Sequence, residues 1–545
     1  MTRNHRGLRH FETARCGAGT TRVAGARQPL SQCRRPAFET SPLERLCGVC
    51  DLLTLRPHDH LLRQASRPTL SLITLRPNAV RLTRTLRLPS TAFDRLKARA
   101  ARLDLDPLRL SMAGMFMLSI GGVHLTLLFL KPLRPALSLA ICAAAYAYLN
   151  PRKLNDGRAL RTWPARVVCA LVVLACLSIP FGLSIGQSAT YLIEEYSKVV
   201  LFWFLLTIAI RHERDIWFFM WSFVLAAAFM CWNAIFVVGV TDQFGSHSAR
   251  LNDAAMGMYD PNDMGVILTI AIPLVLLLTR NAGRLTKLFG LVVLIAIGWT
   301  VALSGSRGSF VGMITVFTII LFALREVSVI RRVSAILVIA GALFLAAPDG
   351  YWKQMGTMLE PSADYNLTDQ DGRVKVWKRG VGYMIRYPVF GLGIANFGRA
   401  EGTISEKAKQ TEDGMGLIFT AAHNSFVQVG AELGIAGLVL WSSLSVGGIF
   451  GLLSLRRRLP RDWATGTTEE RFIYTATMYM PIAYIGFIVT CSFVSFAFMD
   501  PIYILTAFTA ALYACADRRL APPIPPPTTR RGARVPFRSP WLAKR

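Results

Sequence analysis

The chain has 545 residues, of which 52% are hydrophobic and only 17% are charged, and its mean hydropathy is +0.39. Several apolar runs reach about 18 residues, the length that crosses a bilayer as a helix, so composition excludes an assembly of ordinary soluble domains and predicts an all-α integral membrane protein. The net charge of +28 would suit a nucleic-acid-binding protein. The basic residues, however, gather before residue 110 and in short loops, as in the cytoplasmic loops of membrane proteins. We therefore expect no nucleic acid among its partners.

Residues 1–110 form an Arg-rich region that is nearly free of Lys and has no sustained apolar periodicity. We expect this region to be disordered, or to be an over-extended gene start with Met112 or Met115 as the first residue of the native protein. The sequence CGVC at 47–50 could supply half of a zinc site, but no second CxxC completes it. We therefore expect no metal and no other cofactor.

From residue 112 onward the chain contains about twelve apolar runs of the kind that form transmembrane helices. They divide into nine runs within 111–347 and three within 432–516, separated by a large outward loop at 348–431 and followed by a Pro- and Arg-rich tail at 517–545. The runs lie near 112–130, 135–149, 165–185, 196–210, 215–239, 262–279, 286–304, 309–325, 332–347, 432–454, 472–494 and 499–515.

The charges of the loops predict the orientation of these helices. Every second loop is basic, whereas the loops at 186–195 and 493–500, on the other side, carry no basic residue. The loop at 131–135 is an exception, because it lies on that other side and is basic. Because Lys and Arg favour the cytoplasmic side, both termini are expected in the cytoplasm. The large loop then faces the periplasm of a bacterial inner membrane.

Three arginines stand in segments that this orientation places outside, where the charge rule predicts few basic residues. They are Arg250, Arg307 within LSGSRGS, and Arg373. An arginine keeps its charge and grips phosphate oxygens with two N–H groups, so a lipid-linked pyrophosphate suits such a cluster. Two alternatives stay open. Arg250 is also compatible with a solvated loop residue, and 373–386 with an amphipathic surface helix that turns Val374, Trp377, Val381 and Met384 toward the membrane.

Two polar motifs precede apolar runs on the same side. The sequence DPND contains Asp260, Asn262 and Asp263, which fit either a weak metal site or a turn that caps the next helix. The sequence AAHNSF contains His423 and Asn424. An imidazole that titrates near neutral pH suits a general base, although a lone loop histidine is more often structural. Asn424 either caps the following helix or orients His423.

Four stretches of this sequence together resemble the O-antigen ligase and O-antigen polymerase family of bacterial envelope enzymes. They are YDPNDMG (259–265), LSGSRGSFVGM (303–313), GRVKVWKRGVGYMIRYPVFGLGIANFG (372–398) and HNSFVQVGAELGIAGL (423–438). The resemblance implies a GT-C-like membrane fold and a metal-independent glycosyltransferase. Such enzymes move a glycan from undecaprenyl pyrophosphate, at the periplasmic face, to an acceptor hydroxyl on lipid A–core, another glycan or a protein.

By this resemblance, Arg307 and His423 match functional residues of the family, and Arg373 matches the arginine that precedes the family's tryptophan. Arg250 matches an arginine that helps to hold the pyrophosphate, although its link to the DPND turn is longer than the family's usual one. We expect the three arginines to stabilise the departing pyrophosphate and His423 to deprotonate the acceptor. Attack from the face opposite the leaving group would then invert the sugar carbon. Asn424, Asp260 and Asn262 are expected to support this site.

Other functions remain open at this point. A Wzy-type polymerase of O-antigen or exopolysaccharide and a protein O-glycosylation ligase share the same donor chemistry, so the sequence does not separate them from a ligase. A membrane transporter also fits twelve helices. Transporters, however, usually carry ionisable groups or broken helices near the middle of the membrane. In this chain the charges gather at the outer ends of the runs.

Overall fold

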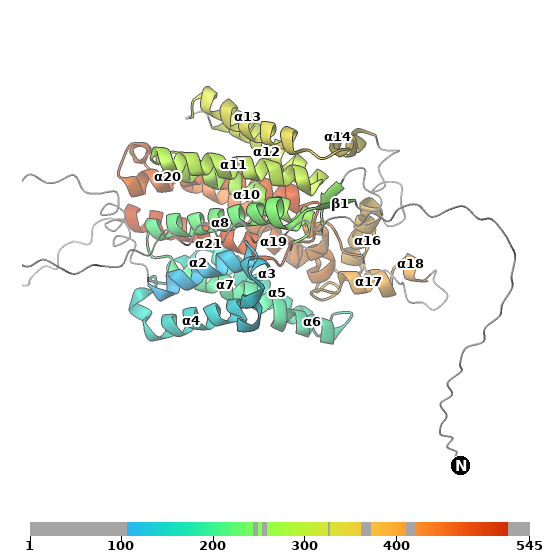
Figure 1. The fold of residues 1–545 in the computed structure, drawn as a ribbon. Helices are drawn as coiled ribbons and strands as arrows, with labels where there is room; N and C mark the ends of the chain where they lie inside the picture. The colour runs from blue at the N-terminus through green and yellow to red at the C-terminus, as the bar shows by residue number, and fades with distance from the viewer. Residues whose placement is uncertain are drawn as a thin grey trace, which may run out of the picture. The chain divides into compact units, whose positions relative to one another are not determined.

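The structure is a computed structural model that describes residues 106–242, 249–252, 259–324, 327–360, 372–409 and 420–521. These residues form an all-α assembly in which most long helices run roughly side by side (Figure 1). The predictions for residues 1–105, the CGVC sequence among them, and for most of the C-terminal tail fall outside the described residues. The predicted fold class, an all-α membrane protein, is confirmed.

The long and short helices follow one another along the whole described chain. They are α2 (Pro107–Ser119), α3 (Val123–Thr126), α4 (Pro135–Leu149), α5 (Trp163–Ser178), α6 (Ile185–Tyr191), α7 (Ser197–Ala209), α8 (Glu213–Asn233), α10 (Pro261–Thr279), α11 (Arg284–Ser304), α12 (Arg307–Ala323), α13 (Val329–Ala346), α14 (Tyr351–Gly356), α16 (Arg373–Arg386), α17 (Phe397–Thr403), α18 (Glu406–Lys409), α19 (Ser425–Arg458), α20 (Thr468–Cys491) and α21 (Asp500–Leu520). Two π-helical turns, Leu192–Tyr196 and Ala234–Val238, extend α6 and α8. A short antiparallel pair joins β1 (Val240–Asp242) to β2 (Ala249–Leu251).

Each of the twelve predicted apolar runs contains a helix. Among the described residues, six helices are long and apolar enough to cross a membrane: α8 with its π-turn, α10, α11, α13, α19 and α20. The helices α4, α5 and α12 are apolar but shorter. The chain is therefore a multi-pass membrane protein, and the count of twelve spans stays a prediction.

The first run differs from the prediction, because it breaks into α2 and α3 at a pair of glycines. Gly121 lies against α8, where an added Cβ atom would come within 3.2 Å of the carbonyl oxygen of Ala226. Gly122 follows with φ +67°, a left-handed conformation that glycine adopts without strain. Close packing and a left-handed turn therefore end α2 before the predicted run is complete.

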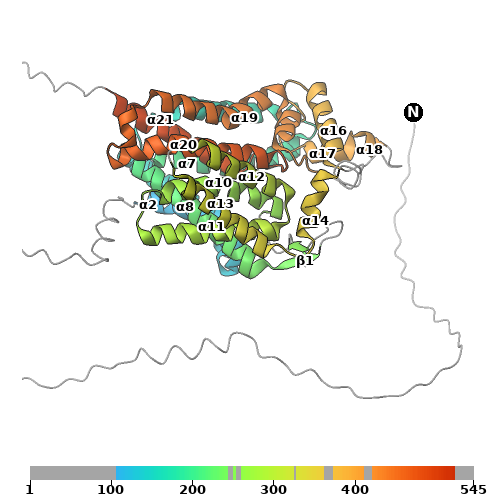
Figure 2. The same cartoon turned by 90° about the horizontal axis from the view of Figure 1, so that it is seen from above.

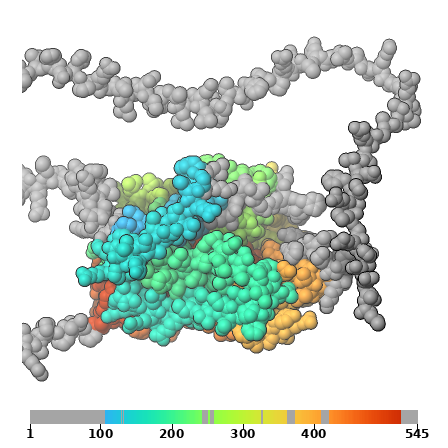
Figure 3. Space-filling model, turned by 90° about the horizontal axis from the view of Figure 1, so that it is seen from below, coloured from blue at the N-terminus to red at the C-terminus, as the bar shows by residue number. Residues whose placement is uncertain are grey.

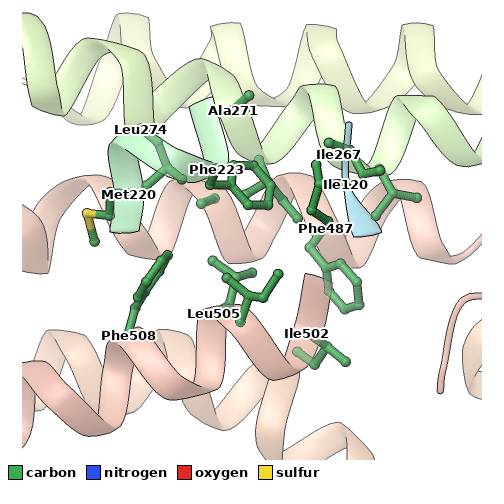
Figure 4. Close-up of a cluster of buried hydrophobic side chains, with 14 of the residues drawn as sticks. Ile120, Met220, Phe223, Ile267, Ala271, Leu274, Phe487, Ile502, Leu505 and Phe508 are labelled. Atoms are coloured by element: carbon green, nitrogen blue, oxygen red, sulfur yellow. The ribbon is translucent and has the colours of Figure 1, made fainter. Parts of the chain in front are cut away.

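The centre of the helix assembly is a layer of apolar side chains between α8, α10, α20 and α21 (Figure 4). Lipid tails are as apolar as these side chains, so close packing rather than exclusion of water holds such helices together. Small residues allow the helices to approach. A Cβ atom on Gly265 would lie 1.8 Å from Ser309 Oγ, and one on Gly312 would lie 2.3 Å from Thr490 Cγ2. Gly265 of α10 and Gly312 of α12 thus allow α12 to pack closely against α10 and α20.

Another face carries exposed apolar side chains, as expected for helices that contact lipid. The first helices, coloured blue to green, form most of the surface seen in Figure 3. On α4 and α5 the exposed apolar residues are Leu137, Ile141, Tyr148, Leu149, Val173 and Leu177. These residues would be costly to expose to water, so this surface fits a bilayer.

Figure 1 shows β1, α14, α16, α17 and α18 at one end of the helices, which we call the site end. The predicted loop 348–431 thus contains several short helices. Helix α19 also begins at Ser425, earlier than the predicted 432, and bends at Gly434, whose φ is +71° and ψ is −168°. The sequence predicted the start of this helix near the bend, because residues 425–431 are more polar than the apolar run that follows.

A buried ion-pair network stabilises the opposite end. Helix α2 begins at Pro107, and the Arg109 side chain is only 1% exposed. Arg109 Nη1 lies 2.6 Å from Asp106 Oδ2, and its Nε lies 2.8 Å from Asp215 Oδ1 at the start of α8. Residues 106–110, which the sequence assigned to the N-terminal region, therefore belong to the folded part.

This network predicts the consequence of starting the chain at Met112. That start removes Asp106 and Arg109 and leaves the Asp215 carboxylate buried without its arginine, which costs about 3–5 kcal/mol for a broken buried pair. We expect much less membrane-inserted protein than from the full-length gene, measured by quantitative immunoblotting of membranes. Adding Asp215→Asn to the shortened chain should restore part of the lost protein. Equal amounts from the full-length and shortened genes would contradict this role of Arg109.

Candidate functional site

His423 lies at the site end, two residues before α19. Its backbone has φ +46°, a left-handed conformation that is strained for a residue with a side chain. The backbone N–H of His423 donates to Ser495 Oγ at 2.9 Å, which holds it there. The imidazole is half-buried. Backbone strain of this kind clusters at functional sites, so the observed outlier supports a functional role for His423.

Two charged residues at the starts of other helices, Arg373 of α16 and Asp260 before α10, act on the His423 imidazole. Burial lowers the pKa of the imidazole, the positive charge of Arg373 lowers the pKa further, and the negative charge of Asp260 raises it in part. The net effect is a pKa below the ordinary value, so His423 is neutral at pH 7 and able to accept a proton. The structure thus brings together three of the predicted residues, His423, Arg373 and Asp260.

Asp260 caps helix α10, which confirms the capping interpretation of the DPND turn. Its Oδ1 accepts hydrogen bonds from the backbone N–H of Asn262 at 2.7 Å and of Asp263 at 2.8 Å. In return, the Asp263 side chain accepts from the backbone N–H of Asp260 at 3.3 Å. Such a cap fixes where α10 starts and holds the Asp260 charge near His423.

Asn424 caps helix α19, which is one of the two roles left open for it. Its Oδ1 accepts from the backbone N–H of Phe426 at 2.9 Å and of Val427 at 3.1 Å. The next residue, Ser425, donates to the carbonyl of Val494 at 2.8 Å and accepts from the N–H of Phe496 at 2.9 Å. The HNSF sequence is therefore attached to the segment that follows α20.

Arg307 is the first residue of α12 and lies just after Gly305 and the capping Ser306. Its Nη1 donates to Thr357 Oγ1 at 3.1 Å. The carbonyl of Gly305 accepts from Gln354 at 2.8 Å, so the turn is fixed from two directions. The positive end of the helix dipole adds to the charge of the guanidinium, as at other helix starts that bind anions.

The turns that carry Arg307 and His423 contact the same segment, residues 492–499 between α20 and α21. A Cβ atom on Gly308 would lie 2.9 Å from Phe493 Cβ, so α12 begins directly against this segment. His423 is bonded to Ser495, two residues further on. The segment 492–499 therefore joins the two predicted catalytic turns, although they are more than 100 residues apart in sequence.

Arg250 lies on β2, opposite Thr241 of β1. Its Nε and Nη2 atoms are buried and have no hydrogen-bond partner among the described residues, whose ranges leave out 243–248 and 253–258 on either side. A buried guanidinium without partners is costly, and an anion would satisfy it. β1 lies at the site end in Figure 1. Its convergence with the other arginines stays a prediction.

Helix α16 packs against α19 (Figure 2), which differs from the alternative of an amphipathic helix on the membrane surface. Its buried residues are Val376, Gly380 and Tyr383, whereas Val381 is 40% exposed. Trp377 Nε1 donates to the carbonyl of Ala422 at 3.0 Å, directly before His423. The tryptophan, which the surface-helix alternative turned toward the membrane, thus contacts the residue before His423.

Sequence reasoning missed two buried carboxylates that hold the loops around the site. Glu401 accepts from Arg379 Nε at 2.9 Å and from the Tyr383 hydroxyl at 2.8 Å, which ties α17 to α16. Glu432, only 2% exposed, accepts from the N–H of Ala395 at 2.9 Å and of Phe397 at 3.1 Å. The sequence could have indicated Glu432, because it is a lone acidic residue at the edge of an apolar run, where an unpaired charge costs free energy.

Gly391 and Gly434 allow the loop after α16 to lie close to Glu432. A Cβ atom on Gly391 would lie 2.4 Å from the backbone of Glu432, and one on Gly434 would lie 2.5 Å from the carbonyl oxygen of Pro388. Both glycines have positive φ. The GLGIAN and AELG sequences therefore form one close contact between the loop after α16 and the bend of α19.

Among the described residues, no group of three or more His, Cys, Asp or Glu side chains is placed to hold a metal ion. Arg307 and Arg373 both stand at the first position of a helix.

One known protein family matches the central part of the chain. The family model described as O-antigen ligase matches residues 289–442, from within α11 to within α19. The matched range contains Arg307, Arg373, His423 and Asn424, whereas Arg250, Asp260 and Asn262 lie before it. No curated protein matches the chain. The resemblance seen in the sequence is confirmed over residues 289–442, the stretch that matches the O-antigen ligase family and contains the turns of Arg307 and His423.

Proposed function

We propose that the chain transfers a glycan from undecaprenyl pyrophosphate to an acceptor hydroxyl of lipid A–core or a similar molecule, at the periplasmic face of the inner membrane. The observation that carries this proposal is a half-buried His423 whose pKa is lowered by burial and by Arg373. A neutral imidazole beside a phosphate-binding cation suits a general base next to an anionic leaving group.

In the proposed reaction His423 accepts the proton of the acceptor hydroxyl while that oxygen attacks the anomeric carbon. The bond from this carbon to the pyrophosphate oxygen breaks, and the electron pair leaves with undecaprenyl pyrophosphate. Arg307, Arg373 and Arg250 stabilise the negative charge that grows there, with about 3 kcal/mol expected for each lost contact. Because attack comes from the face opposite the leaving group, the anomeric configuration is inverted. The arginines supply the positive charge, so this route requires no metal.

The supporting residues act through position and charge. The caps made by Asp260 and Asn424 fix the starts of two helices at the site. The Asp260 charge, which raises the pKa of His423, also stabilises the imidazolium that forms during transfer. Asn262 contributes its backbone N–H to the cap of α10.

The lowered pKa of His423 predicts the pH dependence of transfer. The base must be neutral, so the rate should be constant above this pKa and fall as the pH drops through it, at a value below the ordinary ~6.5. Arg373→Gln removes a charge that lowers the pKa, so the acid side of the normalised profile should move to higher pH. Rates measured in isolated membranes between pH 4.5 and 8 test this.

The matched control for this prediction is Arg399→Gln, which removes an exposed arginine of α17 in the same loop region. We expect its normalised profile to coincide with that of the wild type. An unshifted profile for Arg373→Gln would contradict the proposed coupling of Arg373 to the base.

Deletion of the gene identifies the acceptor and separates a ligase from a polymerase. Lipopolysaccharide and lipid-linked glycans are examined together, with wild-type and mutated copies for rescue. For a ligase we expect bare lipid A–core and long glycan stranded on its carrier. Core with a single repeat unit would show a polymerase instead. If both pools were unchanged, the acceptor would be an exopolysaccharide or a protein, and the lipid A–core part of the proposal would fail.

A further inference from the structure

A cavity of about 530 Å³ lies between α8, α10 and α20. Its walls come from the start of α8, the end of α10 and the start of α20, whereas the functional site uses the start of α10 and the segment after α20. The cavity is therefore at the end of the helices opposite His423, and the proposed reaction does not use it. Its principal lining residues are Arg214, Trp217, Leu277, Leu278, Arg471 and Phe472.

The charged residues that line this cavity are two glutamates, Glu213 and Glu469, and two arginines, Arg214 and Arg471. Glu213 pairs with Arg519 at 2.5 Å, and Glu469 pairs with Arg214 at 2.9 Å. Both lining carboxylates are thus neutralised by arginines. The exposed side chain of Arg471 makes no hydrogen bond or ion pair with any described residue. One guanidinium is left at the mouth with its donors available to an anion.

The interior of the cavity is apolar. Leu277 and Leu278 of α10 are buried, Phe472 of α20 is half-buried, and Trp217 of α8 is 39% exposed. Tryptophan near the end of a membrane helix is typical of the interface between lipid and water. An inorganic anion would contact only the rim, whereas a molecule with an anionic head and acyl chains would contact both parts.

We propose that this cavity binds an anionic phospholipid, with its phosphate on Arg471 and its acyl chains against Trp217 and Phe472. Basic pockets between transmembrane helices at the cytoplasmic side bind such head groups. The opposite end is also where the sequence places the basic loops. This site is separate from the glycan site and does not depend on the proposed transfer reaction.

Lipid binding to the purified full-length protein in detergent tests the proposal. The probes are mixed micelles of phosphatidylglycerol, mixed micelles of phosphatidylcholine, and inorganic phosphate, with binding read from native mass spectrometry and from the shift in Tm. We expect phosphatidylglycerol to bind the wild type and raise its Tm. Arg471→Gln should weaken this binding about fivefold, the expected effect of one basic residue near an anionic surface.

Two variants make the result specific. Arg457→Gln removes an exposed arginine at the end of α19 that does not line the cavity, and its binding should equal that of the wild type. Ala282→Leu narrows the cavity without changing charge and should also weaken binding. Equal loss in Arg471→Gln and Arg457→Gln would overturn the proposal, because it would show non-specific attraction. An equal Tm shift with inorganic phosphate would overturn it as well, since the acyl chains would then play no part.

Discussion

Replacement of His423 by asparagine is expected to abolish glycan transfer while the protein still inserts into the membrane. Loss of a general base costs about 10²–10⁴-fold in rate. Asparagine is the informative substitution because it tolerates the left-handed backbone better than most residues, and His423 has φ +46°. His423→Ala should be equally inactive but adds backbone strain. The rate of transfer in membranes that contain equal amounts of protein measures the effect.

The control for this prediction is Ser495→Ala, which removes the hydroxyl that accepts from the His423 backbone and leaves the imidazole in place. We expect a partial loss of activity, since the base becomes less well positioned but remains present. Normal transfer by a well-expressed His423→Asn protein would refute the role of His423 as base.

Replacement of Arg307 by alanine is the second change with a large expected effect. Removing one group that stabilises transition-state charge costs on the order of 10²–10³-fold in rate, and Arg307 stands at the first position of α12. Arg307→Lys keeps the charge but loses the two-pronged grip on phosphate oxygens, so it should recover only part of the activity. The ratio kcat/KM for the lipid-linked donor is the quantity to measure.

Thr357→Val separates the chemistry of Arg307 from its local contact. This substitution removes the hydroxyl that accepts from Arg307 Nη1 at 3.1 Å and keeps the guanidinium. We expect a small effect compared with Arg307→Ala. If Arg307→Ala retained full kcat/KM, the arginine would serve only the α12 turn, and the proposed pyrophosphate site would lose its best-supported cation.

Much of the fold was predictable because apolar runs of membrane length must form helices, which satisfy their own backbone hydrogen bonds in lipid. Each of the twelve runs contains a helix for that reason. The break at Gly121 and Gly122 was not predicted, since it depends on how closely α2 approaches α8. The early start of α19 was missed as well, because a cap at Asn424 and a bend at Gly434 leave little trace in hydropathy.

The site was predictable in part, since local motifs indicated its polar residues. The sequence singled out His423, Arg373 and Asp260, and the structure places their charges close enough to act on one another. Residues 492–499 were not predicted to matter, because their contacts with the turns of His423 and Arg307 join segments far apart in the chain. A membrane-facing Trp377 stayed open as an alternative, because helical periodicity alone does not reveal its hydrogen bond to Ala422.

The proposed reaction breaks the bond between a glycan and its pyrophosphate carrier. The most direct test mixes purified protein with isolated undecaprenyl-pyrophosphate-linked glycan and lipid A–core in liposomes, then follows free carrier and glycosylated acceptor by mass spectrometry. We expect both products to appear together with wild-type protein and neither to appear with His423→Asn. Movement of intact donor across the bilayer without bond cleavage would contradict the proposed reaction and indicate a transporter.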